Sequence, residues 1–178
     1  MKTIKEIPNN CIYSYDYDNH TDHENLLRRD QTQNRKNALD ESGYTAGHEN
    51  VERAHLHALK YQILGFGGWA VILPILEEDL QNILERGVLI DGMNHQLKIG
   101  KPGGCHQNSL KIWAKNSDRY TMMTGYALSE DGVWRQHSWV YDHKKEVVIE
   151  TTVTRVAYYG FAMTNDEAEE MYTHDSLY

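Results

Sequence analysis

Two patterns of apolar residues follow each other in the second half of the chain. In residues 107–116, apolar side chains recur on one stripe with helical spacing, which predicts a helix. Three later runs alternate with a period of two and are separated by short polar segments typical of hairpin loops: 119–128, 133–141 and 146–152. The sequence therefore predicts a helix followed by an antiparallel β meander.

The first sixty residues are much more polar than the rest of the chain. Asn, Asp, His, Arg and Gln crowd residues 9–50, where aliphatic residues are few. We expect a short extended segment at 11–17 and solvated helices at about 22–39 and 47–61. Such helices are usually scaffold or lid, and the alternative is an arm that binds a partner.

Weaker patterns in the middle of the chain predict shorter elements. Residues 69–75 have the composition of a buried strand or of the entry to a helix. A helix is expected at 76–84, with acidic residues in its first turns and Gly87 as its end. Short strands or loop are expected at 88–90 and 95–99.

The last part of the chain combines a strand with a final helix. Residues 151–154 should continue the third alternating run. Thr164 and Glu167 have the spacing of a capping box, so a helix is expected from there to about Tyr172.

A length of 178 residues suits one domain whose core is stable without disulfides. We predict a single domain, 1–178, with a polar, mainly helical N-terminal segment at 1–60 and the core that carries the chemistry at 61–178. The predicted fold class is α+β, with one helix packed on the antiparallel meander.

Cys105 has the surroundings that a cysteine nucleophile needs. Gly103 and Gly104 allow a tight turn directly before it, and the predicted helix starts close after it. The dipole and unpaired N–H groups of a helix N-terminus favour the thiolate and lower the pKa of a thiol. The same N–H groups can contribute to an oxyanion hole, which makes Gly104 a weaker candidate for substrate positioning.

His137 and Glu150 follow in the order in which a thiol acyl-transfer enzyme uses a base and an orienting acid. If the second hairpin closes symmetrically around His143 and Lys144, His137 faces Glu150 directly, and their Cβ atoms lie about 4.5–5.5 Å apart. A slip of one residue would move Glu150 to the opposite face. The simplest turn therefore predicts that the acid lies beside the base.

Each of these residues also has a structural interpretation. A lone cysteine is most often a small buried hydrophobe, a strand histidine is usually structural, and Glu150 can be an ordinary cross-strand partner. His106 follows Cys105 directly and should point in a different direction. We therefore interpret His106 as a surface or positioning residue and not as the base.

Residues 103–152 resemble the papain-like and transglutaminase-like superfamily of cysteine enzymes, in which a Cys at a helix start precedes a His and an Asp, Asn or Glu on adjacent strands. The resemblance implies Cys105 as nucleophile, His137 as base and Glu150 as orienting acid. It also suggests Gln96, which lies upstream, on the side where papain-like enzymes place an oxyanion-hole glutamine. The turn is similar to the Gly-Gly-x-Cys element of arylamine N-acetyltransferases, although here no residue separates Gly104 from the cysteine.

The predicted function is cysteine-dependent acyl transfer, with a thiol peptidase or amidase acting through a thioester as the leading hypothesis. An acyltransferase such as a transglutaminase uses the same chemistry, with an amine in place of water. A non-catalytic binding or inhibitor module on the same fold is the third alternative. The expected substrate is a protein, a peptide or a small amide, and the sequence does not identify it further.

Metal binding is the competing chemistry for the histidines. His137 and His143 are six residues apart, and His55 and His57 are two apart, but a structural zinc site usually has four ligands in closely spaced pairs. A calcium-loop pattern at 16–24 lacks the required Gly and the closing Glu. We therefore predict no metal site and no cofactor.

Charge and cysteine content limit the partners and the compartment. Lys and Arg total 18 against 26 for Asp and Glu, a net charge of −8 without a basic patch, so neither nucleic acid nor a membrane surface is expected as a partner. Two cysteines and no secretory pattern in residues 1–10 favour the cytoplasm, with export as an effector by a signal-independent route left open. The longest apolar stretch, 63–76, is too short to span a bilayer. Nothing in the sequence indicates the oligomeric state.

Overall fold

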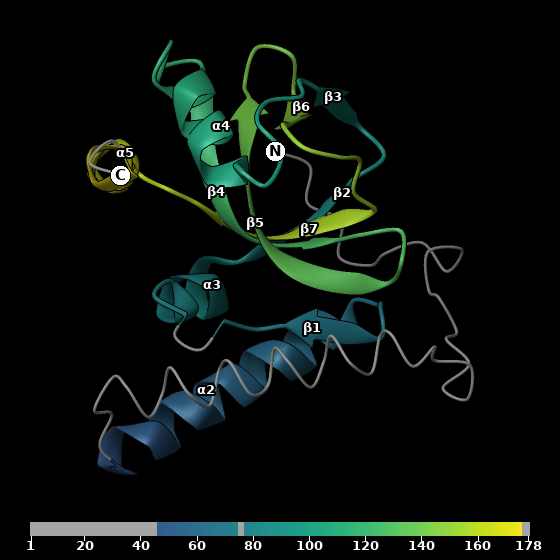
Figure 1. The fold of residues 1–178 in the computed structure, drawn as a ribbon, viewed down its shortest axis with the longest axis vertical. Coiled ribbons are helices and arrows are strands. Elements are labelled where there is room, and N and C mark those ends of the chain that lie inside the picture. Colours follow the sequence, from purple (N-terminus) through teal and green to yellow (C-terminus); the bar gives the residue numbers. More distant parts are fainter. Residues whose placement is uncertain (1–45, 75–76, 176–178) are drawn as a thin grey trace.

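The computed structural model describes residues 46–74 and 77–175, which form an α+β fold with a curled sheet (Figure 1). The helices are α2 (Ala46–Gly65), α3 (Leu80–Arg86), α4 (Cys105–Trp113) and α5 (Asn165–Asp175). The strands are β1 (Ala70–Ile72), β2 (Val88–Asp91), β3 (His95–Leu97), β4 (Tyr120–Leu128), β5 (Val133–Asp142), β6 (Val147–Glu150) and β7 (Ala157–Ala162). The α+β class and the helix before the meander are therefore as predicted.

The sheet has the strand order β2-β7-β4-β5-β6-β3, and β1 pairs with the first part of β5. β4, β5 and β6 form the predicted antiparallel meander. β1 and β3 pair with their neighbours in parallel, which the alternating pattern did not indicate. The sheet is therefore mixed, with most of its pairs antiparallel.

The register of the second hairpin differs from the prediction by two residues. Asp142 pairs with Val147, and Val140 pairs with Ile149, so the loop contains four residues where a symmetric two-residue closure was expected. Glu146 ends this loop with φ +54°, a left-handed conformation that widens the turn. A shift of two residues preserves the face on which each side chain lies, whereas a shift of one would reverse it. His137 and Glu150 therefore remain on the same face, as diagonal and not direct neighbours.

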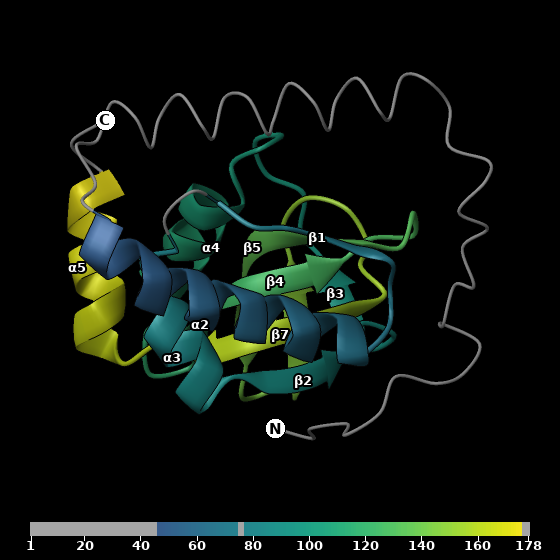
Figure 2. The same ribbon diagram turned by 90° about the horizontal axis from the view of Figure 1, so that it is seen from below.

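All four described helices cover one face of the sheet. Tyr126, Leu128 and Trp134 from this face pack with α2 and α3, whereas Met122 and Val140 pack with α4 and α5. Figure 1 shows α2 and α3 below the sheet and α4 and α5 at its upper left, and Figure 2 shows α2 running across the strands. The opposite face lies inside the curl of the sheet and holds its own apolar cluster: Ile90, Met123, Ala127, Trp139, Tyr141, Val148 and Tyr158.

The second helix expected in the N-terminal segment is present as α2, and it extends four residues further than predicted. Its Leu59 and Ile63 are fully buried in the core cluster that α2 and α3 share with the sheet. The predicted boundary at residue 60 thus falls inside a helix that belongs to the core. The extended segment expected at 11–17 and the helix expected at 22–39 lie outside the described residues.

The helix expected at 76–84 begins later, at Leu80, and ends at Arg86 before Gly87. Glu77 explains the difference, because its buried carboxylate accepts hydrogen bonds from the Tyr126 hydroxyl and from Gln136 Nε2. The side chain is directed into the core, and the chain enters the helix only after it.

The strand does not continue through 151–154 as expected, because β6 ends at Glu150. The backbone N–H groups of Thr151 and Thr152 donate to Glu150 Oε1 at 2.8 and 2.7 Å. The N–H groups of Thr151 and Thr152 therefore bond to the Glu150 side chain and do not pair with a neighbouring strand.

The last helix, α5, begins with the predicted capping box and runs three residues past Tyr172. Glu167 N–H donates to Thr164 Oγ1 at 3.2 Å, and Thr164 N–H donates to Glu167 Oε2 at 2.6 Å.

Candidate active site

The turn before Cys105 has the geometry that the two glycines predicted. Gly103 has φ +72°, which is a left-handed conformation, and Gly104 is the N-cap of α4. Asn108 holds the start of the loop, since its Oδ1 accepts from Lys101 N–H at 3.1 Å and its Nδ2 donates to Lys101 O at 2.9 Å. Cys105 is therefore fixed at the first position of the helix.

A break in strand pairing lies where α4 meets β5. On this edge, β1 pairs with residues 133–135 of β5 and β6 pairs with 140–142, so neither strand covers 136–139. Inside this interval the carbonyl of Ser138 accepts a hydrogen bond from Ser109 Oγ at 3.1 Å. Cys105 lies one turn before Ser109 on the same side of α4. The helix thus replaces a strand at this edge and carries the thiol to it.

His137 and Glu150 form a buried pair on the inner face of the sheet. His137 Nε2 lies 2.9 Å from Glu150 Oε2, and the two side chains are 2% and 0% exposed. The rings of Trp139 and Tyr158 lie nearly parallel to the imidazole, with centroids 6.3 Å away. His137 Nε2 is directed to the Glu150 carboxylate, so Nδ1 is the ring nitrogen that can bond with the Cys105 thiol.

The carboxylate of Glu150 is held from several directions. Oε1 accepts the N–H groups of Thr151 and Thr152 and the Thr152 hydroxyl at 2.8 Å. Oε2 accepts the Tyr158 hydroxyl at 2.9 Å. A carboxylate with this many donors is stable as an anion despite its burial, and it fixes the plane of the imidazole.

The electrostatics of the three groups favour a thiolate beside an imidazolium. Burial alone would raise the pKa of Cys105, but hydrogen bonds with His106 and His137 and their charge lower it to about 5. Burial lowers the pKa of His137, whereas its bonds to Cys105 and Glu150 raise it, and the net direction is upward. Burial raises the pKa of Glu150, but the bond and charge of His137 and the donors at Thr152 bring it to about 2. These shifts favour the Cys105 thiolate, the His137 imidazolium and the Glu150 carboxylate in the folded protein.

His106 is also part of the site, although the sequence suggested only a surface or positioning residue. Its side chain interacts with the Cys105 thiol, and its Nδ1 lies 2.7 Å from Ser138 Oγ. Ser138 Oγ donates in turn to Thr124 Oγ1 at 3.1 Å, and both hydroxyls are buried. Neighbouring residues of a strand point to opposite faces, so Ser138 brings His106 to the outer face while His137 lies on the inner one. The thiol lies at the edge, where both are within reach.

The other two weaker candidates differ in position. Gly104 lies directly before the thiol, as the sequence requires. Gln96 accepts a hydrogen bond from Lys145 Nζ at 3.0 Å, which directs its amide to the β5–β6 turn. The hydrogen bonds of the described residues do not connect Gln96 with Cys105, His137 or Glu150.

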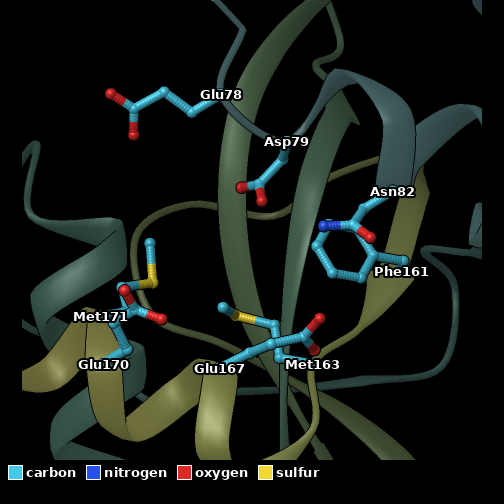
Figure 3. A pocket seen from close by; sticks show the side chains of 8 residues that line it. All are labelled: Glu78, Asp79, Asn82, Phe161, Met163, Glu167, Glu170 and Met171. Atoms are coloured by element: carbon cyan, nitrogen blue, oxygen red, sulfur yellow. The ribbon is translucent and has the colours of Figure 1, made fainter.

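A pocket of about 460 Å³ lies between α3, the end of β7 and α5 (Figure 3). Its wall combines four carboxylates with apolar and amide groups: Glu78, Asp79, Glu167 and Glu170 with Asn82, Phe161, Met163 and Met171. Burial raises the pKa of Asp79, while the nearby charge of His106 acts in the opposite direction. The charge of His106 thus reaches Asp79, although Cys105, His106 and His137 do not line the pocket. Glu167 in the pocket wall forms an ion pair with Arg86 of α3, with an N–O distance of 2.6 Å.

Four hydroxyl residues around the site were not predicted as functional: Thr124, Ser138, Thr152 and Tyr158. Ser138 and Thr124 belong to different strands, and only their register places them together. The position of Thr152, two residues after Glu150, is the one local signal, because a side chain can accept the backbone N–H groups that follow it.

Within 46–74 and 77–175, no group of three or more His, Cys, Asp or Glu side chains is arranged to hold a metal ion. The calcium-loop pattern at 16–24 lies outside this part of the chain. In the described part, no helix has the length and apolar character needed to cross a membrane.

Comparison of the chain with models of protein families, with curated proteins and with solved structures found no match.

Proposed function

We propose that the protein is a cysteine-dependent amide hydrolase that acts through a thioester on Cys105. The observation that carries this proposal is the position of the thiol, which lies at a helix N-terminus and interacts with an imidazole whose other nitrogen lies 2.9 Å from a buried carboxylate. A structural cysteine needs no such set of partners. A nucleophilic thiol needs all of them.

The first step follows from the resting charges. The Cys105 thiolate attacks a carbonyl carbon, and the oxygen that becomes negative can accept N–H groups from the first turn of α4. Gly104 has no side chain with which to cap these groups, so no N-cap side chain would compete with a substrate oxygen. His137, held by Glu150, keeps its positive charge next to the sulfur. As the intermediate collapses, the leaving nitrogen takes a proton from a histidine beside the sulfur and departs as the amine, and water then hydrolyses the thioester.

The arrangement supports a papain-like or transglutaminase-like organisation of the fold. The helix that begins with Cys105 packs on the meander that carries His137 and Glu150. These features are the ones on which the resemblance rests. The order of Cys, His and acid along the chain is consistent with it.

A transferase of the same chemistry has one observation in its favour. The acidic pocket includes Asp79, which the charge of His106 reaches, and its four carboxylates would attract the ammonium form of an amine acceptor. An amine that reaches the thioester before water gives a new amide instead of an acid.

The proposal is tested by offering the protein a peptide mixture together with a labelled alkylamine. The expected result is an acyl group on Cys105, with cleaved amides or amine-labelled peptides as products, both identified by mass spectrometry. Cys105→Ala should abolish these products, and Cys11→Ala is the matched control that should retain them. Products of equal yield from the Cys105→Ala protein would refute the thiol mechanism. A folded wild-type protein that never acylates would favour the binding-module alternative.

A further inference from the structure

Two histidines flank the same thiol in different environments. His137 is almost fully buried and bonded to a carboxylate, whereas His106 is only partly buried and bonded to a hydroxyl. Ser138 Oγ donates to Thr124 Oγ1, so it accepts the hydrogen of His106 Nδ1. With Nδ1 committed in this way, Nε2 is the nitrogen of His106 that can exchange a proton.

The surroundings of His137 make it a poor proton donor. Burial acts against its positive charge, but the bonds to Cys105 and Glu150 outweigh this and raise its pKa. Once the C–S bond has formed, the sulfur is neutral, but the buried Glu150 carboxylate still lies 2.9 Å from Nε2, and giving up the proton would leave this anion without its cation. His137 is also only 2% exposed, which limits its access to a leaving amine. A group that donates and recovers a proton in each cycle needs a less strongly charged setting and access to the leaving group.

We propose that His106 is the second catalytic histidine, the one that protonates the leaving group and later activates water, while His137 stays charged and stabilises the sulfur. The assignment rests on the proposed acyl transfer at Cys105. Ser138 and Thr124 are positioning residues, because they hold the His106 ring through Nδ1.

The proposed cycle starts with Cys105 as the thiolate and with His106 protonated on both ring nitrogens. The thiolate forms the C–S bond, and when the C–N bond breaks, the nitrogen takes the proton of His106 Nε2 and leaves as the amine. Neutral His106 then takes a proton from water as the oxygen attacks the thioester. The C–S bond breaks, the carboxylic acid departs, and the thiolate is restored beside protonated His106. One amide and one water give one acid and one amine.

The experiment compares acylation by esters with different leaving groups in the full chain. p-Nitrophenyl acetate releases an anion that needs no proton, whereas trifluoroethyl acetate releases a basic alkoxide that does. The variant is His106→Asn, whose amide can keep the bond to Ser138 but carries no exchangeable acid. The ratio of the two acylation rates is measured, because a change in the thiolate fraction affects both rates equally and cancels.

His106→Asn should lower the trifluoroethyl to p-nitrophenyl rate ratio by about a hundredfold, the size typical of a lost general acid. His143→Gln is the matched control, because His143 bonds Thr121 Oγ1 in the exposed turn and should leave the ratio unchanged. His106→Gln serves as a second variant with the same expected direction. An unchanged ratio in both His106 variants would overturn the assignment. Absence of acylation at Cys105 in the wild-type protein, with either ester, would overturn the proposed function itself and the assignment with it.

Discussion

Glu150 is the residue whose role depends most on its exact neighbours. Its two oxygens accept from His137 Nε2, from the Tyr158 hydroxyl and from both donors of Thr152. The ordinary pKa of 4.5 falls to about 2. This carboxylate therefore fixes the tautomer of His137 and supplies the charge that stabilises its imidazolium.

Glu150→Gln should lower activity by roughly tenfold or more, and Glu146→Gln should do little. The amide keeps a hydrogen-bonding group but loses the negative charge, and its NH₂ group opposes the N–H of His137. Glu146 lies in the β5–β6 turn, away from this contact. The measurement is the acylation rate of Cys105 in the two variants. Equal rates in both would contradict the role of Glu150.

The same variant has a second readout in the pH dependence of stability. A carboxyl whose pKa is lowered from 4.5 to about 2 stabilises the folded state above its ordinary pKa, and the contribution disappears as the pH falls through about 2. As the pH falls from 4.5 to about 2, the free energy of unfolding of the wild-type protein should therefore decline more steeply than that of Glu150→Gln.

Only part of the site could be predicted at the level of single residues. Cys105, His137 and Glu150 have signals in their order along the chain and in the glycines before the thiol. His106 has no such signal, because adjacency in sequence argued against it. The contact of His106 with the thiol depends on Ser138, which belongs to β5 and bonds the His106 ring. Long-range register decides such contacts, and composition does not encode it.

Among the elements, the turn and α4 set the position of the nucleophile. The helix was expected two residues later than it begins, yet the expectation that Cys105 lies at its start is confirmed. The hairpin register was wrong by two residues, because the four-residue loop was not evident from its polar composition. The face of Glu150 was nevertheless correct, since strand faces repeat every two residues.

Gly103→Ala should lower the free energy of unfolding by about 1–2 kcal/mol, the cost of a left-handed conformation for a residue with a Cβ. The added methyl meets no atom within 4 Å, so the loss measures the backbone strain alone. Urea unfolding monitored by circular dichroism gives the value.

Gly65→Ala is the control for this element. Its added Cβ also meets nothing within 4 Å, but Gly65 ends α2 without a positive φ. Alanine there should be neutral or stabilising by up to about 1 kcal/mol, as helix propensity requires. A loss at Gly65 as large as the loss at Gly103 would show that the strain argument is wrong.

At the scale of the whole molecule, the site needs both faces of the sheet. Ser138 belongs to the outer face that the helices cover, and His137 belongs to the inner face. Cys105 meets the two sets at the unpaired edge of β5 between β1 and β6. The curl of the sheet and its parallel edge strands create this edge, and neither feature follows from the alternation of apolar residues along single strands.

The low pKa of the thiol is consequently a property of the assembled fold. α4 supplies its N-terminus and His106, β5 supplies His137, and β6 supplies the acid. Unfolding separates all of them, so the pKa of Cys105 should return to the free value of about 8.5. A buried structural cysteine would show the reverse order, with a thiol less acidic in the folded protein.

The most direct test is the pH dependence of Cys105 alkylation by iodoacetamide in Cys11→Ala protein, which has one cysteine, measured folded and in concentrated urea. The account predicts a midpoint at about 5 for the folded protein and a midpoint near the free value in urea. A folded midpoint at or above the value in urea would contradict the claim that the fold prepares Cys105 as a thiolate.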